Sequence, residues 1–145
     1  MLQTKQMSLP KRTVINLLIT ANNASDKVNE LLKPFDISSE QFNVLRILRG
    51  QRGVAANMCT IQERMIAKMS NTTRLVEKLL KKGLVNRNIC PQNRRKVEIT
   101  ITPKGLDLLK EIDPLILSFE EDFVSGLGKD ELETLNQYLE KLQRN

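Results

Sequence analysis

The chain of 145 residues has no histidine and no tryptophan, and it has only two cysteines and five aromatic side chains. Without histidine it cannot form a Ser-His or Cys-His catalytic pair, a histidine metal site or a histidine pH switch. No pair of carboxylates, lysines or cysteines stands at a spacing that suggests catalysis. We therefore expect a protein that is not an enzyme and that uses no metal ion and no cofactor.

Long apolar runs are also missing. Met1 to Pro10 lacks the apolar stretch of a secretory signal, and no segment approaches the roughly 20 apolar residues of a membrane span. The sequence predicts a cytoplasmic protein with no membrane partner, in which Cys59 and Cys90 are thiols. We interpret both cysteines as buried structural residues, and the alternative is a redox role.

Charge is plentiful, and it is distributed unevenly. The 23 Lys and Arg exceed the 17 Asp and Glu, which gives a formal net charge of +6. Residues 59–105 hold 11 basic and 3 acidic groups, a net charge of +8, whereas residues 106–145 hold 4 and 10, a net charge of −6. A basic centre predicts a polyanionic partner, and the alternative is a solvated charged surface.

Apolar residues at spacings of three and four predict helices before this basic centre. The first helix covers residues 11–33 and ends at Pro34. The second begins at Ser38, where Gln41 three residues later completes a capping box, and it runs to Gly50. At 145 residues, with 40% apolar and 28% charged residues, the chain has the composition of one globular domain.

The basic centre itself begins with two short helices. We expect a loop that leads into an extended piece at Met58–Cys59, and then a helix that Thr60 caps and that continues to about Lys68. Ser70 is the predicted N-cap of the next helix, 71–82, which is closed by a glycine.

Strands and two further helices complete the pattern. The segments 84–90 and 96–102 are predicted strands. The second gives the clearer signal because it alternates apolar and polar residues, and a basic hairpin loop joins the two. A long helix begins at Pro103, and we expect Pro114 to kink or split it. The last helix covers about residues 130–143.

This order predicts a mainly α fold with a small β-wing, a winged helix-turn-helix over residues 37–105. The helix 71–82 has a polar outer face that fits a DNA major groove about 12 Å wide, and the N-terminal end of such a helix reaches base edges. A basic hairpin tip suits the narrow minor groove. The predicted contacts are Ser70, Asn71, Thr73, Arg74 and Lys78 on the helix, with Lys81 and Lys82 near phosphates, and Asn93, Arg94, Arg95 and Lys96 on the wing.

Several segments then invite comparison with a known family. They are Gln41, Val44 and Leu45 in the second helix, followed by Thr73–Leu79, Gly83–Val85, Pro91–Arg95 and Ile101–Gly105. In these segments the chain resembles the MarR family of bacterial transcription regulators. Arg95 matches the family's minor-groove arginine, and Asn93 stands where the family's wing pattern has Asp.

The resemblance implies a homodimeric repressor that binds double-stranded DNA at a palindromic operator, and often a small aromatic or anionic effector that releases the DNA. The alternative is a winged-helix protein-interaction module that does not read DNA sequence. Within the single unit 1–145, the segments 8–34 and 106–145 would form the dimer, although an intramolecular bundle is the alternative. The predicted dimer residues are Val14, Leu17, Leu18, Leu132, Leu135, Leu139 and Leu142, and the predicted ligand pocket holds Leu17, Ala21, Phe42, Val44 and Phe119.

Overall fold

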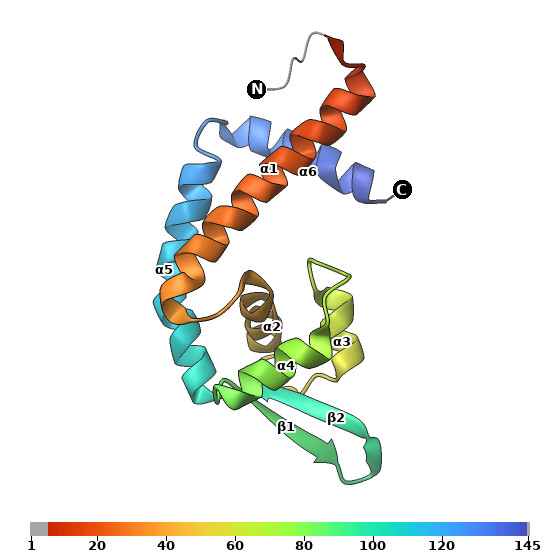
Figure 1. Ribbon diagram of the computed structural model, residues 1–145, viewed down its shortest axis with the longest axis vertical. Helices are drawn as coiled ribbons and strands as arrows, with labels where there is room; N and C mark the ends of the chain where they lie inside the picture. The colour runs from red at the N-terminus through yellow and green to blue at the C-terminus, as the bar shows by residue number, and fades with distance from the viewer. Residues whose placement is uncertain (1–5, 145) are drawn as a thin grey trace.

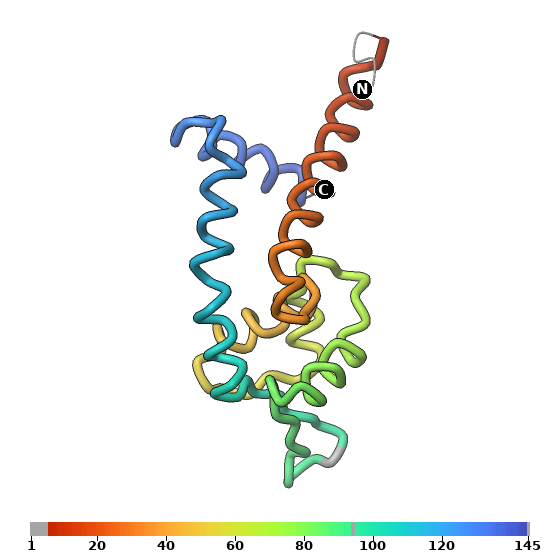
Figure 2. Tube along the Cα trace, turned by 60° about the vertical axis from the view of Figure 1, so that its left-hand side comes forward, coloured from red at the N-terminus to blue at the C-terminus, as the bar shows by residue number. Residues whose placement is uncertain are grey.

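Helices and one β-hairpin follow each other in the computed structural model, which describes residues 6–144 apart from the side chain of Arg94. The lobe formed by α2, α3, α4 and the hairpin lies at one end of the long helices α1 and α5, which run side by side away from it (Figures 1 and 2). The predicted mainly helical fold with a small β-wing is confirmed. The elements are α1 (Leu9–Leu32), the 3₁₀ helix η2 (Lys33–Phe35), α2 (Ser39–Gly50), α3 (Met58–Arg64), α4 (Thr72–Lys81), β1 (Val85–Cys90), β2 (Asn93–Ile101), α5 (Pro103–Phe123) and α6 (Lys129–Gln143).

Side-chain caps explain where several helices begin. The capping box predicted for α2 is present, because the Ser38 hydroxyl accepts from the Gln41 backbone N–H at 3.0 Å and Gln41 Oε1 accepts from the Ser38 N–H at 3.0 Å. At the start of α5, Thr102 Oγ1 accepts from the Gly105 N–H at 3.1 Å. Each bond satisfies a backbone donor that the first turn of a helix leaves without an intrahelical partner.

The predicted start of α3 is wrong. Asn57 is the N-cap, and its Oδ1 accepts from the Thr60 N–H at 2.8 Å, so Met58–Cys59 is the first turn of the helix and not an extended piece. Asparagine caps a helix at least as well as threonine does, and it comes first along the chain. The extended residue lies just before it, where Ala56 pairs with Ile99 of β2 through N···O distances of 2.9 and 2.8 Å.

The connection from α3 to α4 also differs from the prediction. α3 ends at Arg64, before its predicted end, because the chain leaves the helix at Met65, whose side chain is buried. The cap of α4 is Asn71, whose Oδ1 accepts from the Arg74 N–H at 3.2 Å, and not the predicted Ser70. A longer non-helical connection therefore separates the two helices.

The hairpin turn is shorter than predicted. Only Pro91 and Gln92 lie between the strands, and Cys90 pairs with Asn93 across the turn, after a register shift at Ile89. The expected five-residue loop Pro91–Arg95 is therefore wrong. Its last three residues belong to β2, but they carry no apolar alternation because this end of the hairpin is exposed to solvent.

α5 is one helix from end to end, so Pro114 does not split it. A proline inside a helix removes one backbone hydrogen bond and leaves the carbonyl of the residue four positions earlier without its partner. Here Pro114 and Lys110 are both exposed, so water can satisfy that carbonyl. Asp113, which precedes the proline, takes part in an ion pair described below.

One apolar core joins the lobe to the long helices. Leu32 at the end of α1 and three residues of α5 belong to the same buried cluster as the lobe, so the lobe does not have a core of its own. The distal half of α1, the distal half of α5 and all of α6 contribute little to it. The buried members are Leu32, Ile37, Phe42, Val44, Leu45, Leu48, Ala56, Ile61, Met65, Leu75, Val76, Leu79, Leu84, Val85, Ile99, Leu109, Ile112 and Ile116.

The two cysteines occupy different environments. Cys59 is exposed in the first turn of α3, because Ile61 takes the inward position of that turn, whereas Cys90 is half-buried at the end of β1. The prediction that both are buried is therefore wrong for Cys59.

None of the helices within 6–144 is long and apolar enough to cross a membrane. In the same part of the chain, no group of three or more acidic or cysteine side chains is placed to hold a metal ion.

Candidate nucleic-acid interface

Helix α4 presents one polar face to solvent. Its inner positions, Thr72, Leu75, Val76 and Leu79, are buried in the lobe, because apolar residues recur at spacings of three and four. The outer positions are therefore fixed by the packing of the inner ones. The exposed residues are Thr73, Arg74, Glu77, Lys78 and Lys81.

The segment that leads into α4 is held by a residue that sequence reasoning missed. Gln62 of α3 donates from Nε2 to the Lys68 carbonyl at 2.5 Å and accepts at Oε1 from the Thr72 hydroxyl. A single glutamine on a short helix gives no signal in the sequence. Ser70, a predicted DNA contact, has its Oγ buried with no hydrogen-bond partner among the described residues, so this hydroxyl does not face the surface as Asn71 does.

The wing carries basic side chains that reach solvent. Arg95 and Lys96 are exposed, in the part of β2 between the paired positions Asn93 and Val97, where the register shift interrupts the regular pairing with β1. Asn93 Oδ1 accepts from the backbone N–H of Arg95 at 3.1 Å, so it stabilises the turn and not the arginine head group. Of the predicted wing contacts, Arg94 has its side chain outside the described part of the chain.

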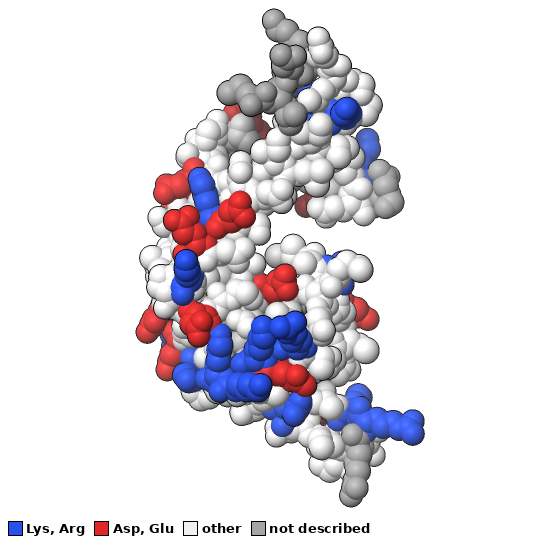
Figure 3. Space-filling view, viewed as in Figure 1, with Lys and Arg blue, Asp and Glu red and all other residues white. Residues whose placement is uncertain are grey.

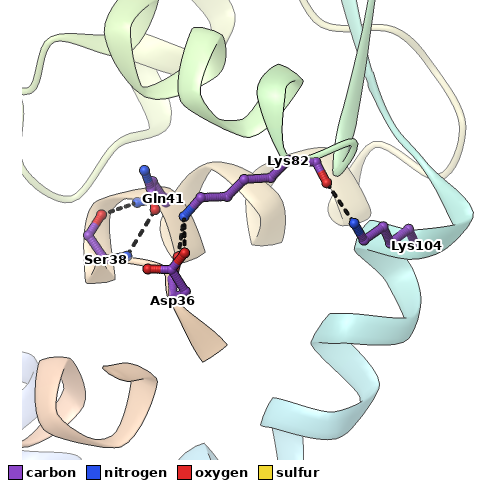
Figure 4. A network of polar contacts seen from close by, with 5 residues as sticks. All are labelled: Asp36, Ser38, Gln41, Lys82 and Lys104. Carbon is purple, nitrogen blue, oxygen red and sulfur yellow. Dashed lines mark hydrogen bonds and ion pairs between the residues drawn. The ribbon is translucent and has the colours of Figure 1, made fainter. Parts of the chain in front are cut away.

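The C-terminal end of α4 is fixed to two other elements. Lys82, the C-cap of α4, donates to the Asp36 carbonyl and lies 3.7 Å from Asp36 Oδ2, beside the capping box of α2 (Figure 4). Lys104 in the first turn of α5 donates to the Lys82 carbonyl at 2.8 Å. Lys82 is therefore engaged within the protein, whereas the sequence placed it with Lys78 and Lys81 near phosphates.

Positive charge gathers on the face that carries α4 and the hairpin. Figure 3 shows Lys and Arg concentrated over the lower part of this face, whereas Asp and Glu are more frequent on the left-hand side, where α5 lies. The outer face of α4 and the wing thus belong to one basic surface. The cations of these elements and of the adjoining turn of α5 are Arg74, Lys78, Lys81, Lys82, Arg87, Arg95, Lys96 and Lys104.

A cavity lies between the lobe and the long helices. Its volume is about 400 Å³, and α1, α2, α5 and the connection before α4 all contribute to its wall. Of the five residues predicted for a ligand pocket, the structure brings together Phe42 and Phe119, whereas Leu17 and Ala21 are not among the lining residues and Val44 is fully buried in the core. The lining residues are Ala24, Ser25, Val28, Ser39, Glu40, Phe42, Asn43, Arg46, Ile66, Ala67, Ile116, Phe119 and Glu120.

The helices at the far end expose apolar side chains. Val14, Leu17 and Leu18 of α1 are 54%, 37% and 59% exposed, and Leu135 and Leu142 of α6 are 39% and 50% exposed. Where exposed apolar side chains form a contiguous patch of more than a few hundred Å², they mark an interaction surface. The two remaining predicted dimer residues, Leu132 and Leu139, are half-buried.

Several known proteins are similar to this chain in sequence and in structure. The MarR family model matches residues 37–97. A MarR transcription factor from Planctomyces limnophilus is 31% identical, with a TM-score of 0.72, over 92% of this chain and 97% of that chain. A MarR mutant from E. coli complexed with operator DNA is 24% identical, with a TM-score of 0.80, over 92% and 94%. Bordetella bronchiseptica BpsR, whose DNA binding is regulated by 6-hydroxynicotinic acid, is 22% identical, with a TM-score of 0.82, over 91% and 98%.

Proposed function

This chain belongs to the MarR family of transcription regulators, and from that membership we propose that it represses transcription by binding a palindromic operator as a homodimer. The observation that carries the proposal is the single basic surface on which the outer face of α4 and the wing lie together. Such a surface provides both the phosphate contacts that give affinity and the side chains that read base edges.

The two parts of the surface have different tasks. Thr73 and Arg74 lie in the first turn of α4, exposed, where a recognition helix meets base edges in the major groove. Lys78 and Lys81 follow on the same exposed side and contact phosphates. Arg95 on the wing enters the minor groove, where a narrow groove concentrates negative potential.

A second copy of the chain is the partner that the exposed apolar residues of α1 and α6 require. Two recognition helices must lie about 34–36 Å apart to reach successive major grooves, and a two-fold dimer sets that separation. The far end of the molecule is suited to the contact, because residues 106–145 carry a net charge of −6 and are repelled by DNA phosphates.

The cavity beside α2 is the proposed effector site. Phe42 and Phe119 supply aromatic surface, and the Arg46 guanidinium lies 5.2 Å from the centre of the Phe42 ring. The lining also includes the carboxylates of Glu40 and Glu120, so the cavity favours a small aromatic compound, and Arg46 is the lining residue that can pair with an anionic group on it. A ligand there would contact both α5 and the connection before α4, so it could alter DNA binding. Adding aromatic acids during a DNA titration, and measuring whether DNA affinity changes, tests whether this cavity is an effector site.

Selection of bound DNA from a random pool, followed by gel-shift titration, tests the proposal. Arg95→Ala should weaken operator binding, and Arg74→Ala should cost about 1–3 kcal/mol of binding free energy and relax the sequence preference at one position. Affinity for the selected operator should fall steeply with salt concentration, because several phosphates are neutralised.

The matched control is Arg12→Ala, which removes an exposed arginine from α1, far from the basic surface. It should leave operator affinity unchanged. A wild-type protein that selects no sequence, but that binds a protein stoichiometrically, would instead be a winged-helix interaction module. Unchanged affinity in both Arg74→Ala and Arg95→Ala would also contradict the proposal.

A further inference from the structure

An ion pair connects the lobe to α5 at one defined point. Arg49 in the last turn of α2 donates from its two terminal nitrogens to the two carboxylate oxygens of Asp113, at 2.7 and 3.1 Å. The residues are 64 positions apart in the sequence, and their side chains are 35% and 44% exposed. Among the side chains that the structure describes, one other ion pair is present, between Lys82 and Asp36.

This ion pair fixes the orientation of α2 relative to α5, which the neighbouring apolar contacts do not. The core shared by α2 and α5, which includes Leu45, Leu48, Leu109 and Ile112, holds the two helices together. Apolar burial is non-directional, so it tolerates a small rotation or sliding of one helix on the other. A planar guanidinium that meets a carboxylate through two parallel bonds fixes both separation and orientation.

The ion pair lies at the point along α5 where the helix can bend. Asp113 directly precedes Pro114, where α5 lacks one backbone hydrogen bond and where a helix bends most readily. Beyond this point α5 runs to the far end of the molecule, and before it the helix packs against the lobe (Figures 1 and 2). The pair therefore lies where the lobe and the dimerisation helices would move relative to each other.

We propose that Arg49 and Asp113 are positioning residues that set the angle of the DNA-binding lobe on α5, and with it the half-site spacing that the dimer accepts. The inference rests on the proposed function. In a two-fold dimer any rotation of the lobe occurs in both protomers, so the separation of the recognition helices changes twice as much. Successive major grooves on one side of DNA lie about 34–36 Å apart. The preference of the protein for one half-site spacing therefore reports the orientation of its two lobes.

The experiment compares a selected operator with two derivatives in which one base pair is inserted or removed between the half-sites. The measured quantity is the ratio of affinities for the correct and altered spacing, in wild type, Asp113→Asn and Arg49→Lys. Asp113→Asn removes the charge, and Arg49→Lys keeps the charge but loses the planar fork. In both variants the ratio should fall measurably and by no more than about fivefold, the upper end of what a partly exposed ion pair contributes.

The matched control is Glu111→Gln, which removes one negative charge from α5 on an exposed residue that makes no ion pair with the described residues. Its spacing ratio should equal that of wild type, as should its thermal midpoint. A role limited to stability would lower the midpoint of Asp113→Asn and leave the spacing ratio unchanged, which would overturn the inference.

A measurement without DNA separates orientation from affinity. A spin label on the exposed Cys59 of α3, in a Cys90→Ser background, reports the distance between the two lobes of the dimer. Asp113→Asn should broaden or shift that distance distribution, and Glu111→Gln should not. An unchanged distribution together with an unchanged spacing ratio contradicts the inference alone, whereas a wild-type protein that selects no DNA sequence contradicts the proposed function as well.

Discussion

Gly105 is the residue that the close contact between α5 and the hairpin requires. A Cβ at this position would lie 2.5 Å from the Leu84 carbonyl oxygen and 2.7 Å from Ile101 Cγ1. Gly105→Ala should therefore lower the free energy of unfolding by about 1–3 kcal/mol, because the backbone of α5 must shift away from a packed core. Urea denaturation measures the change.

Gly126 provides the control for that substitution. A Cβ there would meet no atom within 4 Å, and Gly126 lies in the turn between α5 and α6. Gly126→Ala should leave the unfolding free energy within about 0.5 kcal/mol of wild type. Equal effects of the two substitutions would show that the close approach at Gly105 is not what destabilises the protein.

Single residues also show where sequence reasoning stops. The exposure of Arg74, Lys78 and Arg95 could be predicted, because each stands opposite an apolar face or near a hairpin end. The bond of Lys82 to the Asp36 carbonyl could not, because it joins residues 46 positions apart, and the burial of the Ser70 hydroxyl depends on packing that a single sequence does not display. The sequence alone does not show whether a lysine or serine side chain faces solvent or the protein interior.

At the scale of elements, the first turn of α4 combines a structural task with a proposed functional one. Asn71 caps the helix through its Oδ1, and it is exposed beside Thr73 and Arg74. Asn71→Asp should keep the unfolding free energy within about 0.5 kcal/mol, since Asp caps as well as Asn. The same variant should weaken operator binding by at least about tenfold, because a carboxylate then enters the negatively charged major groove with the first turn of α4. Chemical denaturation and gel-shift titration measure the two effects.

Asn71→Ala separates the contributions. It removes the cap and should cost about 1 kcal/mol of stability, but it introduces no repulsion, so its loss of DNA affinity should be smaller than that of Asn71→Asp. If Asn71→Asp binds the operator as tightly as wild type, the start of α4 does not enter the major groove, and the proposed docking is incorrect.

The order of the elements was largely predictable, and their boundaries were less so. Periodicity and capping patterns located α1, α2, α4, α5 and α6, because each has an apolar stripe over several turns. The start of α3 and the tip of the hairpin were mispredicted. Asn57 accepts from the Thr60 N–H and so caps α3 in place of the predicted Thr60, and Asn93 accepts from the Arg95 N–H at the hairpin tip. The cavity, the Gln62 bonds and the Arg49–Asp113 pair are products of tertiary packing, which a single sequence does not display.

At the scale of the whole molecule, the division into a basic lobe and an apolar far end argues for a dimer. The exposed apolar side chains of α1 and α6 lie at the end opposite the hairpin (Figure 1). Leaving them in water costs about 25 cal/mol per Å² of apolar surface, a cost that burial against a second copy removes. The proposed dimer would also give two half-site contacts their combined affinity.

Leu18→Glu tests this arrangement directly. Leu18 is 59% exposed in the single chain, so the substitution should not disturb the core, but a carboxylate buried in a dimer interface is strongly unfavourable. Sedimentation equilibrium should show a monomer, and operator affinity should fall by about 100-fold or more because one half-site is bound at a time. Val54→Glu, at a 66% exposed position in the loop before α3, makes the same chemical change away from α1 and should remain a dimer with full affinity. A Leu18→Glu protein that stays dimeric would place the subunit contact elsewhere on the molecule.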